Sequence, residues 1–581
     1  MILSKSEKEV LKSSFIYLKP HKLKLCMLYI ISILSNVAEL FPIYFTGNII
    51  NYVVEKDFSK IISCIIKILL VFVVMMVLSS IETYLSEYLK NSITRDIKNH
   101  IFNKVVTLPM SDYDALGIGH LMSVIEGDSS CIANFYTGQV LNIIIALITS
   151  VISFVFMLKL SVLLAIISVV TFPISFIGMK YFGKKIKVYV EKIRILNDEY
   201  TLSLTEILSY ISEVKCLCQE DNMKKRFFRY QEKFFDLNMK TSMLTMLSNI
   251  FDISMTTFSD WLVIGVGCYQ MIHNKLKIGS YVSFNGYVGK FIRGINAILG
   301  LLVSFQTLSV SLKRINEILQ KDSEDIEMLS GNGNQISILG DIEVSGLKFK
   351  YEHSHKNVLE MVNVNIKPNT VNVMVGLNGS GKSTLFKLLE KLYTFKEGSI
   401  EIDGKNIDKF SCGEIRQAIS YVQQRTYLFS DTIRYNLTFE ADSVTEEEIY
   451  EVCKEVGIHD LIMSFPEQYN TLLGKGGIRL SGGETQKLAI ARALLRKTKI
   501  ILLDESTSDL DGSAEREILN ILHKISEDHT IIMISHRISA IVGIENIYVF
   551  KNGVIVAHGN HTELLKENVD YQMLVQCQMS K

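Results

Sequence analysis

Long apolar runs fill the first half of the chain and constrain its fold more than any other feature. Six segments before about residue 310 are apolar and long enough to cross a lipid bilayer as helices, which takes about 20 residues each. They lie at residues 24–53, 61–85, 134–158, 160–182, 246–272 and 280–305. The pattern therefore predicts an α-helical transmembrane domain with six spans.

The lengths of the connections predict the topology of this domain. Three connections are very short, around residues 55–60, 159–161 and 273–279. The other two, at about 87–130 and 183–244, run to tens of residues and are rich in Lys and Arg. By the positive-inside rule the long connections face the cytosol. An even number of crossings then places both termini in the cytosol, and we expect a multi-pass protein of the cytoplasmic membrane.

A glycine-rich motif in the second half predicts a nucleotide-binding site. Residues 376–384 read GLNGSGKST and fit the phosphate-binding loop pattern. Glycines let consecutive backbone N–H groups point at phosphate oxygens, and the following helix adds its positive N-terminal end. The residues that we expect to bind ATP here are Gly376, Asn378, Gly379, Ser380, Gly381, Lys382, Ser383 and Thr384. Of these, Lys382 would reach the β- and γ-phosphates, and the Ser383 hydroxyl would ligate Mg²⁺.

An apolar strand further along the chain predicts the catalytic carboxylates. Residues 500–503 are apolar enough for a central strand of a parallel sheet, and Asp504 and Glu505 follow directly. Asp504 is expected at the Mg²⁺ ion and Glu505 beside the γ-phosphate, where a carboxylate can orient or deprotonate the attacking water. The alternative is a structural carboxylate pair at a strand end.

The order of motifs resembles that of the ABC transporter family, specifically half-transporters of the exporter type. Tyr351 matches the aromatic residue that stacks on adenine, and Gln424 matches the glutamine that senses Mg²⁺ and contacts the membrane domain. His536, after an apolar run, matches the switch histidine at the γ-phosphate. Residues 480–484 match the signature loop, and Asp511 lies in the match to the loop that crosses to the other subunit.

This resemblance implies that two nucleotide-binding domains meet head to tail. Each ATP would then be held by one subunit's phosphate loop and by Ser481, Gly482 and Gly483 of the other subunit's signature loop. Gln424, Glu505 and His536 would be the catalytic residues, and Ser383, Gln424 and Asp504 would hold the metal. The implied organisation is a transmembrane domain at residues 1–318, a linker at 319–339 with a Gly/Asn-rich stretch, and an α/β P-loop nucleotide-binding domain at 340–581.

Three residues depart from the family pattern. The signature loop ends in Glu484 where Gln is usual, Gln423 replaces the usual Pro, and Lys475 stands where exporters usually carry Glu. Since none of these changes removes a group expected at phosphate, metal or water, we interpret the site as able to hydrolyse ATP. The effect of Glu484 and Lys475 on the contacts that couple ATP hydrolysis to transport is not determined by the sequence.

Ionisable residues inside membrane spans are costly and are candidates for function. Glu39, Asp252, Asp260, Lys290 and Arg293 lie in the predicted spans. Asp260 and Lys290 have similar depths, about 16–20 Å from the short loop between the last two spans. We therefore expect an Asp260–Lys290 pair, and a polar cavity lined by Lys290 and Arg293. The alternative is that these charges are neutralised within the bundle or lie at its edge.

Two further features concern the helices and their connections. Pro42 and Pro173 are expected to kink the first and fourth spans. The long connections resemble the intracellular loops of exporters, whose tips carry short coupling helices. These tips are expected at residues 108–114 and around 204–210.

The sequence thus predicts ATP-driven export of a peptide, lipid or drug-like substrate by alternating access. The partner would be a second copy of the chain or a related half-transporter. Half of a heterodimer is the nearest alternative, and an ATP-gated regulatory or channel-type membrane protein is an alternative of another class. The formal net charge of zero gives no case for a nucleic-acid partner.

Overall fold

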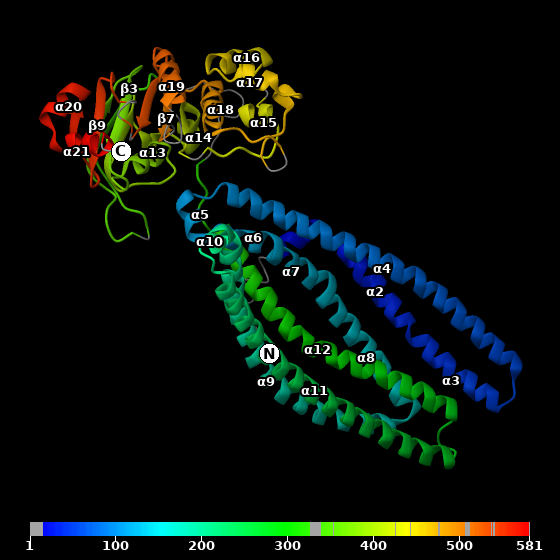
Figure 1. Ribbon diagram of the computed structural model, residues 1–581. Coiled ribbons are helices and arrows are strands. Elements are labelled where there is room, and N and C mark those ends of the chain that lie inside the picture. Colours follow the sequence, from blue (N-terminus) through cyan, green and yellow to red (C-terminus); the bar gives the residue numbers. More distant parts are fainter. Residues whose placement is uncertain are drawn as a thin grey trace. The chain divides into compact units, whose positions relative to one another are not determined.

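The computed structural model describes residues 15–325, 338–352, 354–424, 426–441, 443–474, 477–505, 512–535, 537 and 541–579. By its internal contacts the chain divides into two compact units (Figure 1). The first, the membrane unit, comprises Met1–His100 and Ser123–Asn316. The second, the nucleotide unit, comprises Ile101–Met122 and Glu317–Lys581.

The membrane unit is built from long helices (Figure 1). The principal ones are α2 (Lys22–Ala38), α3 (Leu40–Val54), α4 (Phe58–Val106), α8 (Val140–Leu160), α9 (Val162–Ser209), α11 (Glu220–Ile272) and α12 (Ile278–Leu319). Shorter helices are α7 (Ser129–Asn134) and α10 (Ile211–Cys216), and two π-helical turns cover Val124–Asp128 and Phe135–Gln139. Helix α6 (Ile118–Ser123) belongs to the nucleotide unit except for its last residue.

Three helical stretches in the described part of the chain are long and apolar enough to cross a membrane. They are Phe15–Val54, Phe58–Val106 and Ile118–Leu160, and they contain the first three predicted spans. The other three predicted segments lie within the long helices α9, α11 and α12. The fold is therefore a helical membrane region followed by a nucleotide-binding domain, and the count of six spans stays a prediction.

The two prolines have different effects on their helices. α2 ends at Ala38 and α3 begins at Leu40, so the helix is interrupted at Glu39. Pro42 explains the break, because its ring collides with the carbonyl four residues earlier and it has no N–H to donate there. Pro173, by contrast, lies inside α9 without interrupting it.

Helices α3 and α12 of the membrane unit pack closely against each other. A Cβ atom on Gly279 would lie only 1.8 Å from the carbonyl oxygen of Gly47, so neither position has room for a side chain. Asn51 Oδ1 accepts a hydrogen bond of 2.9 Å from the Gly279 backbone N–H, and the Tyr287 hydroxyl donates to the Leu40 carbonyl at 3.2 Å. Small residues let helix backbones approach closely in membranes.

The structure corrects the expected Asp260–Lys290 pair. Lys290 on α12 instead forms an ion pair with Glu39, at the break between α2 and α3. The prediction was wrong because similar depth along two helices does not determine which faces are opposed. Glu39 is available because the interruption upstream of Pro42 lies opposite Lys290. The side chain of Arg293 lies outside the described residues.

The structure also moves the second predicted loop tip. Helix α9 continues through Ser209, and the short helix between α9 and α11 is α10, Ile211–Cys216, just after the expected residues 204–210. The first tip forms as expected: α5 covers Met110–Leu116, directly after Pro109, and belongs to the nucleotide unit.

Two sheets form the core of the nucleotide unit. The larger has the order β10-β9-β3-β8-β7-β6, in which all neighbours are parallel except β10 and β9. Its strands are β3 (Val371–Gly376), β6 (Ile419–Val422), β7 (Ile500–Asp504), β8 (Thr530–Ile534), β9 (Asn546–Lys551) and β10 (Val554–Gly559). The smaller, antiparallel sheet has the order β2-β1-β4-β5, with β1 (Ile342–Phe349), β2 (Leu359–Ile366), β4 (Glu397–Ile402) and β5 (Lys405–Asn406).

Strand β7 shows how the core is divided between the faces of the larger sheet. All five of its residues are buried, as the apolar run predicts. Ile501 and Leu503 pack into one hydrophobic cluster, whereas Ile500 and Leu502 pack into another. The helices of this unit are α13 (Lys382–Leu389), α14 (Cys412–Ala418), α15 (Ile433–Thr438), α16 (Glu446–Glu455), α17 (His459–Ser464), α18 (Gly482–Leu495), α19 (Gly512–Ile525), α20 (His561–Glu567) and α21 (Val569–Met579).

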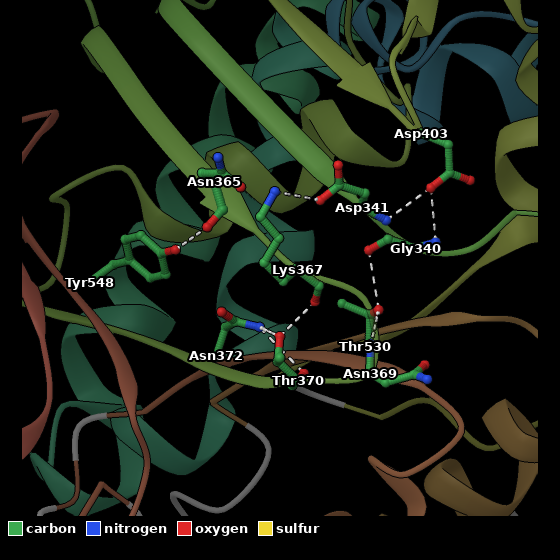
Figure 2. A network of polar contacts seen from close by, with 10 residues as sticks. All are labelled: Gly340, Asp341, Asn365, Lys367, Asn369, Thr370, Asn372, Asp403, Thr530 and Tyr548. Carbon is green, nitrogen blue, oxygen red and sulfur yellow. Dashed lines mark hydrogen bonds and ion pairs between the residues drawn. The ribbon is translucent and has the colours of Figure 1, made fainter.

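A polar network fixes the point where the chain enters β1 (Figure 2). The Asp403 carboxylate accepts hydrogen bonds from the backbone N–H groups of Leu339, Gly340 and Asp341, at 2.7, 3.1 and 2.9 Å. The Thr530 hydroxyl donates to the Gly340 carbonyl at 3.1 Å. These contacts join the end of the predicted linker to both sheets, because Asp403 follows β4 and Thr530 begins β8.

Candidate nucleotide-binding site

The phosphate loop connects the end of β3 to the start of α13. Gly381 has a φ of 105°, and a Cβ atom there would lie 2.6 Å from the Leu359 side chain, so the turn requires glycine. The Lys382 ammonium group donates to the carbonyls of Gly376 and Leu377, at 2.9 and 3.0 Å. Its side chain is buried, and burial lowers the pKa of Lys382 although Glu505 and Asp504 act in the opposite direction. The Lys382 ammonium group is thus bonded to carbonyl oxygens of its own loop. The phosphate oxygens of a bound nucleotide can take the place of these carbonyls.

Asp504 is held at both of its carboxylate oxygens. The Ser383 hydroxyl donates to Oδ1 at 2.9 Å, and the Tyr421 hydroxyl donates to Oδ2 at 2.8 Å. Burial raises the pKa of Asp504, and these two hydrogen bonds act against that rise. A hydroxyl and a carboxylate in contact are the oxygen donors that Mg²⁺ prefers, so these residues fit the predicted ion.

Tyr421 was missed by the sequence reasoning, although a signal for it exists. It lies on β6, which pairs in parallel with β7, three residues before Gln424. A polar side chain near the carboxyl end of the neighbouring strand is placed to contact Asp504.

Glu505 leaves the strand in an unusual backbone conformation. Its φ is 45°, and its N–H donates to the Ile534 carbonyl at 3.1 Å. Non-glycine residues rarely adopt this conformation, which costs on the order of 1–3 kcal/mol and is often found at functional sites. Gln424 Nε2 donates to Glu505 Oε2 at 2.6 Å, so the predicted glutamine and carboxylate are in contact.

These groups converge on one cavity of about 270 Å³. It is lined by Val358, Asn378, Gly379, Ser380, Gly381, Lys382, Ser383, Thr384, Gln424 and Glu505. The structure therefore brings the phosphate loop together with Gln424 and with Glu505, which follows the loop by more than a hundred positions in the sequence.

The signature loop explains the departure at Glu484. Ser481 is the N-cap of α18; its Oγ accepts from the Glu484 N–H at 3.4 Å, and Glu484 Oε2 accepts from the Ser481 N–H at 2.7 Å. This reciprocal arrangement is a capping box, in which Glu serves as well as Gln. The negative charge also lies at the positive end of the helix. Gly482 and Gly483 form the first turn of α18.

Several predicted residues lie outside the described part of the chain. These are His536, Asp511 with the rest of its loop, and Lys475. Their roles stay predictions.

A buried carboxylate at the C-terminal end of α13 predicts a pH effect on stability. Burial raises the pKa of Glu390 to about 7, against the opposing charges of Arg496 and Arg416. The folded state therefore favours the protonated acid, and stability falls as the pH rises from the ordinary pKa of 4.5 towards 7. Glu390→Gln mimics the protonated form. We expect it to raise the unfolding temperature of the nucleotide unit at pH 8 and to leave it unchanged at pH 4.5.

Scanning fluorimetry of the full chain in detergent would measure this difference, with the exposed Glu343→Gln as the matched control. A gain in unfolding temperature of equal size at both pH values would contradict the assignment, since it would not depend on ionisation.

Comparisons with known proteins agree with this site. Residues 25–295 match the family model of the ABC transporter transmembrane region, and residues 359–508 match the ABC transporter model. A Bacillus subtilis (strain 168) protein, YgaD, is 29% identical over 487 residues, 82% of each chain. A Staphylococcus aureus (strain bovine RF122 / ET3-1) protein is 30% identical over 495 residues, 84% of each chain. Both are provisionally named multidrug export ATP-binding/permease proteins.

The chain belongs to the ABC transporter family. It fuses the family's transmembrane region to its ATP-binding domain, in the arrangement of an exporter-type half-transporter. The ABC transporter is therefore a membrane protein that binds ATP and an ATPase coupled to transport, and its function is ATP-driven export. Half-transporters of this family typically work as dimers.

Proposed function

We propose that this ABC transporter is a homodimeric exporter of the cytoplasmic membrane, with six transmembrane helices in each subunit and both termini in the cytosol. The contact between Gln424 and Glu505 at the rim of the phosphate-loop cavity is the observation that carries this proposal. This contact supports a hydrolytic site formed by the residues of this chain. A homodimer of such chains would not need a different partner chain to supply an active site.

In the proposed cycle, Ser383, Asp504 and Gln424 would hold Mg²⁺, which would neutralise charge on the β- and γ-phosphates. Glu505 orients or deprotonates the attacking water, and His536 contacts the γ-phosphate. Tyr351 stacks on adenine. Ser481, Gly482 and Gly483 of one subunit, with Asp511, face the ATP bound by the other. ATP binding then favours the closed dimer and hydrolysis weakens it, which shifts the membrane domain between inward- and outward-facing states.

The substrate we propose is a drug-like or lipophilic molecule. The names of the relatives support it, as do aromatic side chains around an apolar cavity of about 220 Å³ in the membrane unit. Phe41, Tyr44, Phe45, Phe156 and Tyr287 line this cavity, together with Val37, Leu40 and Ile152. The alternative substrates are a peptide or a lipid. The compounds that stimulate ATP turnover would show which of these classes is transported.

The test of the proposal is ATP turnover by this chain alone, reconstituted in lipid nanodiscs, together with uptake of substrate into inverted vesicles. Turnover that is stimulated by lipophilic compounds, with concentrative uptake, is expected for a homodimeric exporter. Negligible turnover in a folded sample that binds ATP would support the heterodimer instead. ATP binding that opens a passive conductance would support the channel-type alternative.

The Glu39–Lys290 ion pair gives a test of the proposed cavity charges. Glu39 is 42% exposed at its side chain and Lys290 13%, so the carboxylate is the more accessible partner. We expect Lys290→Leu to reduce transport, because it leaves Glu39 charged and unpaired inside the membrane. The double variant Glu39→Lys with Lys290→Glu restores the pair with its charges exchanged.

If these residues also line the substrate cavity, the exchanged variant will fold normally but prefer probes of a different charge. Substrate-stimulated ATP turnover with cationic, neutral and anionic lipophilic probes would measure that preference. Wild-type transport of every probe by Lys290→Leu with Arg293→Leu would exclude a role for the pair and for Arg293 in the cavity.

A further inference from the structure

A second cavity, of about 510 Å³, lies beside the predicted adenine-stacking residue within the nucleotide unit. Tyr351, Asn357 and Tyr393 contribute to its wall from the nucleotide-binding domain. Ser111 and Asp114 contribute from α5, the first loop tip, which belongs to the same compact unit. This cavity is therefore bounded on one side by a segment that connects to the membrane helices.

The ring of Tyr351 is positioned to receive a base. Its hydroxyl lies 3.2 Å from Thr384 Oγ1, so the ring is fixed next to the phosphate loop. The rings of Phe349 and Tyr393 contact it nearly at right angles, at 83° and 88°. Among the described residues no aromatic ring is stacked parallel on Tyr351. The Lys387 ammonium group lies over one face, 5.9 Å from the ring centroid, so a purine would stack on the opposite face.

Asp114 is fixed in this cavity by one oxygen and leaves the other for a ligand. The Tyr393 hydroxyl donates to Asp114 Oδ2 at 2.6 Å. Burial, and then this hydrogen bond, raise the pKa of Tyr393, so the phenol keeps its proton and remains a donor at neutral pH. Oδ1 of the exposed Asp114 carboxylate has no hydrogen-bond partner among the described residues. Asp112, on the same helix, is instead paired with Lys321 at 2.7 Å.

We propose that Asp114 reads the base of the bound nucleotide by accepting a hydrogen bond from the 6-amino group of adenine. Adenine presents a donor at this position, whereas guanine presents the acceptor O6, which a carboxylate repels. The contact makes Asp114 a specificity-determining residue that favours ATP over GTP. It also lets α5 respond to the base directly, in addition to any signal from the γ-phosphate. This inference rests on the proposed stacking of adenine on Tyr351.

The experiment compares three nucleotides on the full chain in nanodiscs: ATP, GTP, and purine riboside triphosphate, which lacks the 6-amino group. A hydrogen bond to a charged group corresponds to a preference of about 10- to 100-fold. We therefore expect kcat/KM for ATP to exceed that for the other two by this factor in the wild type. Asp114→Asn should narrow the ratio of ATP to GTP, because an amide can donate to O6 as well as accept from an amino group.

The matched control is Asp112→Asn, the same chemical change on the same helix, which should leave the ratio unchanged. Tyr351→Leu should weaken the binding of all three nucleotides by the same factor, because stacking contacts the face of the purine and does not involve the group at position 6. Tyr393→Phe should lower the ratio, because it frees Asp114 to turn away.

A wild-type enzyme that does not distinguish the three nucleotides would overturn the inference. So would equal losses for ATP and GTP in Asp114→Asn, because that pattern means the carboxylate only holds α5 in place. Both outcomes leave the proposed transport function intact. A wild-type chain that hydrolyses none of the three would instead count against the proposed homodimer.

Discussion

Replacement of Glu505 by Gln is expected to lower ATP turnover by about 100- to 10,000-fold, the usual contribution of a positioned general base. The change keeps the size of the side chain and a hydrogen-bonding amide, so ATP binding should persist. Glu505 contacts Gln424 and is the one carboxylate among the described residues that line the phosphate-loop cavity. Its neighbour Asp504 has both oxygens engaged by Ser383 and Tyr421.

Phosphate release from the purified chain in nanodiscs measures this effect, and ATP-dependent thermal stabilisation measures binding. The matched control is Glu484→Gln, the same substitution at the signature loop. It should keep its turnover, because Gln can still accept the Ser481 N–H in the capping box. Wild-type turnover in Glu505→Gln would show that another group activates the water.

Lys382→Ala is expected to weaken ATP binding by more than about 100-fold. The ammonium group is buried and already bonded to two carbonyls of the loop, and phosphate oxygens would replace these weaker partners with charged ones. Each hydrogen bond to a charged group contributes about 1.5–3 kcal/mol, so losing the bonds to two phosphates gives a loss of at least this size. The dissociation constant of a fluorescent ATP analogue would measure it.

Lys409→Ala, at an exposed lysine of the same unit, is the control for nonspecific loss of positive charge and should bind ATP normally. Normal binding by Lys382→Ala would mean that the backbone N–H groups of the loop are sufficient to hold the phosphates.

The nucleotide site was largely predictable because its chemistry depends on short, contiguous motifs. The phosphate loop needs glycines at fixed spacing, and Asp504 and Glu505 follow an apolar strand that must be central. Tyr421 was not predicted, because it reaches Asp504 only through the parallel pairing of β6 with β7. Glu484 is a departure in the sequence but an ordinary capping residue in the structure.

In the membrane unit the helices were predictable from the sequence, but the contacts between them were not. Apolar runs located its helices, and Pro42 predicted a disturbance of the first one. The sequence nevertheless assigned Lys290 the wrong partner: depth along a helix follows from counting residues, but the direction of a side chain depends on how neighbouring helices are rotated. The partner became Glu39 because the break upstream of Pro42 places it opposite α12.

The sequence by itself thus determined the helical membrane region, the α/β nucleotide-binding domain and the position of the phosphate loop, because local patterns specify these features. Tertiary structure alone decided which distant residues meet: Gln424 with Glu505, Tyr421 with Asp504, and Tyr393 with Asp114. Such contacts depend on strand order and helix packing, which are properties of the whole fold and are not encoded in the spacing of any one segment.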